Sequence, residues 1–281
     1  MNKTVLFFDS GVGGLPYLNA FAGRHPYINA VYIADDAHFP YGAKTKKELV
    51  SLLIALFSEL LPRFEPVLVV IACNTASVTA LAALRERFPY VDFVGTVPAV
   101  KPAVLHTQTG KIGILGTERT LADPYIRHLL ARAQAETGKH CVLVHRAAPE
   151  LVDFIEHDFW ESSDITKTDI TRKYIHYFCG HTTDGIILGC THFLLLLHYF
   201  ETCAENSMLI FHSIGGVCRQ AEKLLAKKTG APAAEARDAP AAEKSDAARR
   251  NHVYITGSSI SEKWIRAAEF FHVNIDLLSH A

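Results

Sequence analysis

Two apolar runs in this chain each end in a cysteine that is followed at once by polar residues. Residues 67–77 read VLVVIACNTAS, and residues 184–194 read DGIILGCTHFL. Runs this short and this apolar are typical of strands buried on both faces of a parallel sheet. In such a sheet the ligand site lies beyond the carboxyl ends of the strands, which is where Cys73 and Cys190 fall.

Apolar runs alternate with amphipathic stretches along most of the 281 residues. Strand character is found at 3–9, 30–36, 92–97, 111–117, 141–147 and 252–257, and helical periodicity at 15–26, 44–64, 76–89 and 261–271. This alternation predicts an α/β fold with mostly parallel sheets flanked by helices. Asp9 and Thr117 join the two cysteines at predicted strand ends.

A faint internal repeat appears when VVIACNT is aligned with IILGCTH on the two cysteines. It predicts two similar lobes with the active site in the cleft between them. We expect residues 1–96 with about 208–281 to form the first lobe, and residues 97–207 the second. Residues 231–250 hold nine Ala, two Pro and mixed charges, so we expect an exposed insertion in the first lobe.

Composition argues against several classes of function. The formal net charge is −1, so neither a nucleic acid nor a membrane surface is expected as a partner. Residues 1–14 do not resemble a signal peptide, and no apolar run approaches the length that spans a bilayer. We therefore predict a cytoplasmic protein whose six cysteines are thiols, with no CxxC pair and no spacing typical of a metal site.

The stretch DSGVGG at residues 9–14 follows the first predicted strand. A Gly-rich turn can hold a phosphate at a helix N-terminus, but GxGG differs from the dinucleotide pattern GxGxxG. The Asp9 carboxylate would also repel a phosphate. A loop that lets the backbone approach a small polar ligand fits better, with Asp9 available to an ammonium group or a thiol.

Cys73 and Cys190 differ from the other four cysteines, which have the character of buried structural residues. Each precedes a predicted helix whose N-terminus would stabilise a thiolate, and polar residues at 74–75 and 191–192 could bind a carboxylate. Three chemistries remain open: disulfide exchange, a Cys190–His192 nucleophile, or acid–base catalysis on opposite faces of one carbon. The repeat favours the third, because it duplicates the thiol.

Five motifs in order resemble the glutamate racemase family: FFDSGVGG (7–14), FPYG (39–42), ACNTAS (72–77), VPAVKPA (97–103) and LGCTH (188–192). The resemblance covers most of the chain outside about 231–250. It implies an isomerase that interconverts L- and D-glutamate without a cofactor and supplies D-glutamate for peptidoglycan. Ser77 after the CNTA core favours glutamate, because the related aspartate racemases typically carry His there.

The resemblance also implies a role for each matched residue. Cys73 would deprotonate D-glutamate and Cys190 would deprotonate L-glutamate, with no metal involved. Asp9, His192 and Glu156 would assist the thiols. The expected substrate-binding residues are Asp9, Ser10, Pro40, Tyr41, Gly42, Asn74, Thr75, Thr117, Thr120, Thr191 and His192. The implied partners are D- or L-glutamate and a second copy of the chain in a homodimer.

Two positions depart from the family pattern: Leu194 stands where Pro is frequent, and His212 where Asp is common. Two other functions remain as alternatives. One is a racemase of the same superfamily that acts on aspartate or another amino acid. The other is a non-catalytic ligand-binding protein that uses residues 231–250 for a partner.

Overall fold

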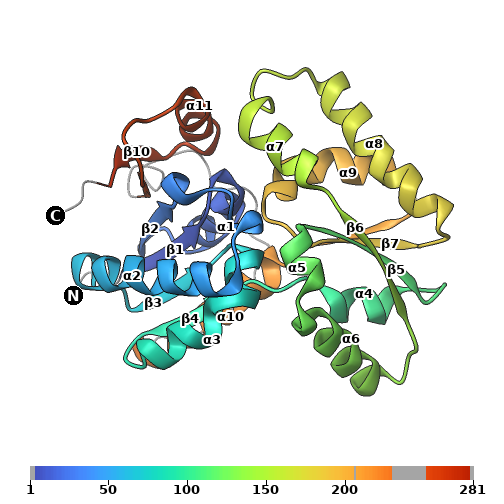
Figure 1. Cartoon of the computed structure of the whole chain (residues 1–281), viewed down its shortest axis with the longest axis horizontal. Helices are drawn as coiled ribbons and strands as arrows, with labels where there is room; N and C mark the ends of the chain where they lie inside the picture. The colour runs from blue at the N-terminus through green and yellow to red at the C-terminus, as the bar shows by residue number, and fades with distance from the viewer. Residues whose placement is uncertain (1–3, 206, 230–250, 279–281) are drawn as a thin grey trace. The chain divides into compact units, whose positions relative to one another are not determined.

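The computed structural model describes residues 4–205, 207–229 and 251–278, so the predicted insertion at 231–250 lies outside the described residues. The chain divides into two compact units, Met1–Thr96 with Ile214–Ala281, and Val97–Ser213. Each unit is built on its own parallel sheet with helices packed against it (Figure 1). The predicted α/β fold with two similar lobes is thus confirmed as a fold class.

The first unit holds a six-stranded sheet in the order β10-β9-β2-β1-β3-β4, in which every pair is parallel. The strands are β1 (Thr4–Asp9), β2 (Asn29–Ala34), β3 (Leu68–Ile71), β4 (Asp92–Gly95), β9 (His252–Ile255) and β10 (Asn274–Leu277). The central strands β1, β2 and β3 are almost wholly buried, as expected for strands covered on both faces.

Helices cover both faces of this sheet because successive side chains of a strand point in opposite directions. Leu6 and Phe8 belong to a buried cluster with α2 and α3, whereas Phe7 contacts Phe21 of α1 with ring centroids 5.4 Å apart. The helices of this unit are η1 (Val12–Gly14), α1 (Leu15–Arg24), η2 (Asp36–His38), η3 (Tyr41–Ala43), α2 (Lys46–Phe64), α3 (Asn74–Arg87), α10 (Ile214–Thr229) and α11 (Glu262–Phe271).

The second unit holds a four-stranded parallel sheet in the order β6-β5-β7-β8. Its strands are β5 (Lys111–Gly116), β6 (Val142–Ala147), β7 (Gly185–Leu188) and β8 (Leu209–Phe211). Ile112 and Ile114 pack with α4 and α6 on one face, and Gly113 lies against Phe178 of α8 on the other. The helices are α4 (Val100–His106), α5 (Glu118–Ala122), α6 (Pro124–Thr137), α7 (Pro149–His157), α8 (Asp164–Gly180), η4 (His192–Leu196) and α9 (Leu197–Ala204).

The two sheets share a strand order, since β2-β1-β3-β4 corresponds to β6-β5-β7-β8 when strands are numbered within each unit. In this correspondence β3 matches β7. Cys73 and Cys190 therefore follow equivalent strands, each two residues after the last strand residue. The faint sequence repeat around the two cysteines thus corresponds to a strand order that the two sheets share.

The sequence-based boundary at about 208 falls short of the observed one at residue 214. The reason is β8, a strand of three residues that pairs with β7 and so keeps residues 209–211 in the second unit. Neither β8 nor β10 was predicted as a strand: β8 is an apolar run of only three residues, and β10 is four residues long, mostly exposed and partly polar. Within the described residues no helix is long and apolar enough to cross a membrane.

Gly113 in β5 offers a direct test of this packing. A Cβ atom there would meet the Phe178 ring at 2.5 and 2.7 Å, and Phe178 is fully buried. We expect Gly113→Ala to lower the free energy of unfolding by about 1–3 kcal/mol, measured by urea denaturation. Gly180→Ala is the matched control, since a Cβ there meets nothing within 4 Å. Equal stabilities of the two variants would contradict the described packing of α8 on β5.

Candidate active site

Cys73 lies at the N-terminus of α3, in the position that caps the helix. Its Sγ accepts a hydrogen bond from the backbone N–H of Ala76 at 3.5 Å, and the residue is 5% exposed. The donor belongs to the first turn of the helix, where unsatisfied N–H groups and the helix dipole both favour negative charge. The local fold therefore supports a negatively charged sulfur at this position, as expected from the sequence.

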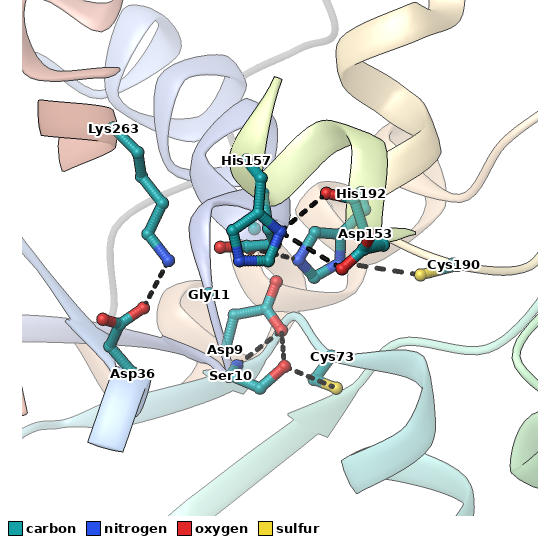
Figure 2. Close-up of polar contacts among 12 residues, drawn as sticks. Asp9, Ser10, Gly11, Asp36, Cys73, Asp153, His157, Cys190, His192 and Lys263 are labelled. Carbon is teal, nitrogen blue, oxygen red and sulfur yellow. Dashed lines mark hydrogen bonds and ion pairs between the residues drawn. The ribbon is translucent and has the colours of Figure 1, made fainter. Parts of the chain in front are cut away.

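Asp9 ends β1, the strand that pairs with β3, so it lies at the same sheet edge as Cys73. Figure 2 shows the connection between them: Asp9 Oδ1 accepts from the Ser10 N–H at 2.7 Å, and Ser10 Oγ lies 3.4 Å from Asp9 Oδ1 and 3.9 Å from Cys73 Sγ. All three residues are buried. Ser10, expected as a substrate-binding residue, is thus also the hydroxyl between the carboxylate and the thiol.

The turn after β1 needs a glycine at position 14. A Cβ on Gly14 would meet the Tyr32 hydroxyl at 2.6 Å and Asp9 Cβ at 2.9 Å. The Gly14 N–H also donates to the Tyr32 hydroxyl at 3.1 Å, and that hydroxyl donates to Gly11 O at 2.7 Å. This part of the DSGVGG stretch therefore fixes the turn that carries Asp9 and Ser10.

The FPYG stretch forms the short helix η3 after an exposed Pro40. Tyr41 is 2% exposed and shares a buried cluster with Cys73, and Gly42 follows it partly exposed. The Tyr41 hydroxyl donates to Asp35 Oδ2 at 2.5 Å. Burial and the Asp35 carboxylate raise the pKa of Tyr41 well above its usual value, with smaller contributions from the charges of Cys73 and Asp9. Tyr41 is therefore a protonated phenol beside the thiol.

Asn74 and Thr75 occupy the first turn of α3, directly after the thiol, and both are buried. Neither Oδ1 nor Nδ2 of Asn74 has a hydrogen-bond partner among the described residues. A buried amide without partners is costly, and such groups are rare in native proteins unless they serve a function. The Asn74 side chain is thus a candidate ligand-binding group next to Cys73.

Cys190, His192 and Glu156 form a second buried group, in the other unit. His192 Nε2 lies 2.6 Å from Glu156 Oε1, and His192 Nδ1 lies 3.6 Å from Cys190 Sγ (Figure 2 shows the contact to Cys190). Burial by itself would lower the pKa of His192, but the hydrogen bonds and charges of Cys190 and Glu156 raise it well above its usual value. Glu156 comes from α7, and Thr191, which lies between Cys190 and His192 in sequence, is buried.

The predicted helix directly after Cys190 is a tight 3-10 turn, η4, and the α-helix α9 begins only at Leu197. The sequence THFLLLL does not favour an early helix start, since Thr191 makes no side-chain cap. The Cys190 sulfur therefore has a side chain, His192, as a polar partner, where Cys73 has a helix N–H. The two thiols have different electrostatic surroundings.

Thr117 and Thr120 follow β5 and contact each other. Thr117 caps α5 by accepting from the Thr120 N–H at 3.2 Å, and its hydroxyl donates to Thr120 Oγ1 at 3.0 Å. This capping explains their presence without a ligand, so their predicted binding role stays a prediction.

Leu194, where the family often has Pro, is buried within η4. His212 lies between β8 and α10, and burial lowers its pKa.

One buried carboxylate next to this site was missed by the sequence reasoning. Asp35 follows β2 and is fully buried, whereas the sequence predicts it only as part of the strand at 30–36. A carboxylate at a strand end, six residues before a Tyr of a recognised motif, was the available signal.

No group of three or more His, Cys, Asp or Glu that could hold a metal ion occurs in the described ranges.

The profile of the Asp/Glu/Hydantoin racemase family matches residues 18–210. Glutamate racemase of Treponema pallidum is 36% identical over 219 residues, 78% of this chain and 80% of that protein. Glutamate racemase of Glaesserella parasuis is 38% identical over 228 residues, 80% of this chain and 82% of that protein.

Solved structures agree with these sequence matches. Escherichia coli glutamate racemase, crystallised with L-glutamate and the activator UDP-MurNAc-Ala, superimposes with a TM-score of 0.78 at 29% identity, covering 99% of this chain and 97% of that chain. The resemblance predicted from the five motifs is confirmed. The chain therefore belongs to the Asp/Glu/Hydantoin racemase family and, within it, to the glutamate racemases, which are amino-acid isomerases.

Proposed function

We propose that this protein interconverts L- and D-glutamate without a cofactor, using Cys73 and Cys190 as the two acid–base groups. One observation carries the proposal: equivalent strands of two similar units each end in a buried thiol linked through a second side chain to a buried carboxylate. A thiol on each face of the α-carbon lets one remove a proton while the other delivers one, which inverts the centre.

On the Cys73 side, Ser10 can follow the protonation state of the sulfur. When Cys73 is a thiolate, the Ser10 hydroxyl can donate to it, together with the Ala76 N–H. When Cys73 carries the proton, its S–H can donate to Ser10 Oγ, and Ser10 can donate to Asp9 Oδ1. Ser10, Asp9 and the Ala76 N–H thus stabilise both the thiolate and the thiol form of Cys73, which the catalytic cycle requires.

On the Cys190 side, a protonated His192 stabilises the thiolate. Its raised pKa keeps the imidazole cationic near neutral pH, with one N–H directed to Glu156 and the other to Cys190. A thiolate–imidazolium pair is a base that needs no helix N-terminus. This pair alone would also suit a nucleophilic thiol, but the second buried thiol and the family membership favour proton transfer.

The carbanion formed at the α-carbon lies beside a carboxylate and needs stabilisation from the protein. Preorganised donors around that carboxylate would supply it, since they carry no reorganisation cost at the moment of reaction. The Asn74 amide, which has no hydrogen-bond partner in the described part of the chain, and the buried Thr75 are well suited on the Cys73 side, with Thr191 on the other. Holding the substrate between two fixed thiols supplies the orientation.

The wider setting is part of the same proposal. Family membership supports a role in supplying D-glutamate for peptidoglycan, in the cytoplasm, by a homodimer. The proposed reaction requires that both thiols reach the α-carbon of one substrate. Glutamate is proposed over aspartate because the curated relatives and Ser77 both favour it.

The first prediction concerns the reaction itself. In deuterated water without added cofactor, L-glutamate should lose optical rotation and gain deuterium at Cα, measured by circular dichroism and proton NMR. Cys73→Ser and Cys190→Ser should each slow racemisation by about a thousandfold or more, because each removes one acid–base group. Cys179→Ser, which changes an exposed free thiol, should match the unmodified protein. Turnover of L-aspartate instead would move the assignment to the alternative substrate, and inactivity on both would contradict the proposal.

The second prediction concerns pH. Glu156→Gln removes the carboxylate that helps to raise the pKa of His192, so burial should then lower that pKa. His192 would lose its proton at a lower pH, and kcat/KM should fall about tenfold more at about pH 8 than at about pH 6. Glu150→Gln is the control on the same helix, since Glu150 binds Tyr174 and Arg146. A constant ratio to the unmodified protein across this pH range would count against the thiolate–imidazolium pair.

The third prediction separates stability from activity. Asn74→Leu removes a buried amide without partners among the described residues, so it should raise the free energy of unfolding by about 1 kcal/mol. The same change should lower kcat/KM about 10- to 100-fold if the amide binds the substrate carboxylate. Thr79→Val, which removes another such group from α3, should raise stability with activity unchanged. Full activity of Asn74→Leu would remove Asn74 from the binding site.

A further inference from the structure

The segment after residue 250 supplies a hydroxyl to the loop that carries Tyr41. Thr256 directly follows β9, and β9 pairs with β2, the strand that ends just before Asp35. The Thr256 hydroxyl donates to Asp35 Oδ1 at 2.8 Å and accepts from the Ala37 N–H at 3.0 Å. Thr256 is 3% exposed and Asp35 is fully buried. A threonine hydroxyl has one proton to donate, so this geometry commits it to the carboxylate.

Asp35 connects this hydroxyl to Tyr41. Its Oδ2 accepts from the Tyr41 hydroxyl at 2.5 Å, while its Oδ1 lies 2.8 Å from both Thr256 Oγ1 and His38 Nδ1. A buried carboxylate is stable only when hydrogen bonds replace its hydration. Each donor therefore restricts the position of Asp35, and Asp35 in turn restricts the position of Tyr41.

Tyr41 lies beside the thiol of the same unit. The helix η3 that begins at Tyr41 packs on α3, which Cys73 caps, and Tyr41 and Cys73 share one buried cluster. The proposed substrate loop continues with Gly42. A shift of Asp35 would thus displace the loop at the edge of the reacting thiol.

A second contact joins the same two segments. Lys263 of α11 lies 2.6 Å from Asp36 Oδ1, as Figure 2 shows, and both side chains are largely buried. The Lys263 ammonium also lies 5.8 Å from the centre of the Phe39 ring. The loop from Asp35 to Tyr41 is therefore held by residues more than 200 positions away in sequence.

We propose that Thr256 is a positioning residue for catalysis: its hydroxyl holds the Asp35 carboxylate and, through it, the Tyr41–Gly42 loop next to Cys73. This inference rests on the proposed function, because it assigns the loop to substrate binding. Thr256 itself acts through Asp35 and Tyr41.

The test compares Thr256→Val, which keeps the shape and removes the hydroxyl, with Thr256→Ser, which keeps the hydroxyl. If the Tyr41–Gly42 loop is displaced, the protein loses binding energy that stabilises the substrate and the transition state equally. We therefore expect Thr256→Val to raise KM for both enantiomers about tenfold, with kcat changed less than about threefold. Thr256→Ser should restore KM. Thr183→Val is the matched control, since its buried hydroxyl donates to Phe178 O, in the other unit.

A second measurement needs no turnover. Hydrogen–deuterium exchange followed by mass spectrometry should show faster exchange in a peptide covering residues 35–43 for Thr256→Val, by about tenfold, with Thr256→Ser and Thr183→Val close to the unmodified protein. If Thr256→Val does not fold, Thr256→Ala removes the same hydroxyl with less bulk and takes its place in both measurements.

The outcomes separate the two proposals. An unchanged KM together with unchanged exchange at 35–43 overturns the role of Thr256. A rise in KM that Thr256→Ser fails to restore also overturns it, because the hydroxyl would then not be the cause. If the unmodified protein racemises neither glutamate nor aspartate, the proposed function fails, and exchange alone decides whether Thr256 holds the loop.

Discussion

Parallel strand pairing is the constraint on which the rest of this structure depends. Every strand pair in both sheets is parallel, so the carboxyl ends of neighbouring strands meet at one edge. Because helices cover both faces, the interiors of the central strands β1, β3 and β7 are apolar, and polar groups lie where these strands end. Ser10 and Cys73, 63 residues apart in sequence, approach each other for this reason. Asp35, Thr256 and Asp9 gather at strand ends in the same way.

Buried carboxylates fix the geometry around both thiols. The carboxylates of Asp9, Asp35 and Glu156 are each at most 2% exposed. They bind, in that order, the side chains of Ser10, Tyr41 and His192, which lie next to one of the two thiols. Removing such charges from water is costly, so each carboxylate keeps its position only while its donors stay in place. The same interactions that compensate burial therefore set the directions of Ser10, Tyr41 and His192.

The two units surround their thiols with different hydrogen-bond partners. Cys73 caps an α-helix and takes a backbone N–H, whereas Cys190 precedes a 3-10 turn and takes the imidazole of His192. A helix N-terminus presents a fixed positive potential, but an imidazole gains or loses its charge with pH. The two acid–base groups of the proposed reaction should thus respond differently to pH, although they follow equivalent strands.

Much of this architecture could be predicted from residues alone. The apolar runs of β1, β3, β5 and β7 and the helical periodicity between them indicated the fold class, since apolar strands that alternate with amphipathic helices are typical of covered parallel sheets. The motifs around Cys73 and Cys190 identified the family. The short strands β8 and β10 escaped prediction, because three or four residues are too few to show a distinctive periodicity.

By itself, then, the sequence determined that two thiols would follow two buried strands, because burial of an apolar run is a local property that a pattern of residues records. Tertiary structure alone decided which partners those thiols and their neighbours acquired. Glu156 reaches His192 from another helix, and Thr256 reaches Asp35 across 221 positions of sequence. Such pairs depend on the order and register of strands in a sheet, which nonlocal packing selects and no short stretch of sequence encodes.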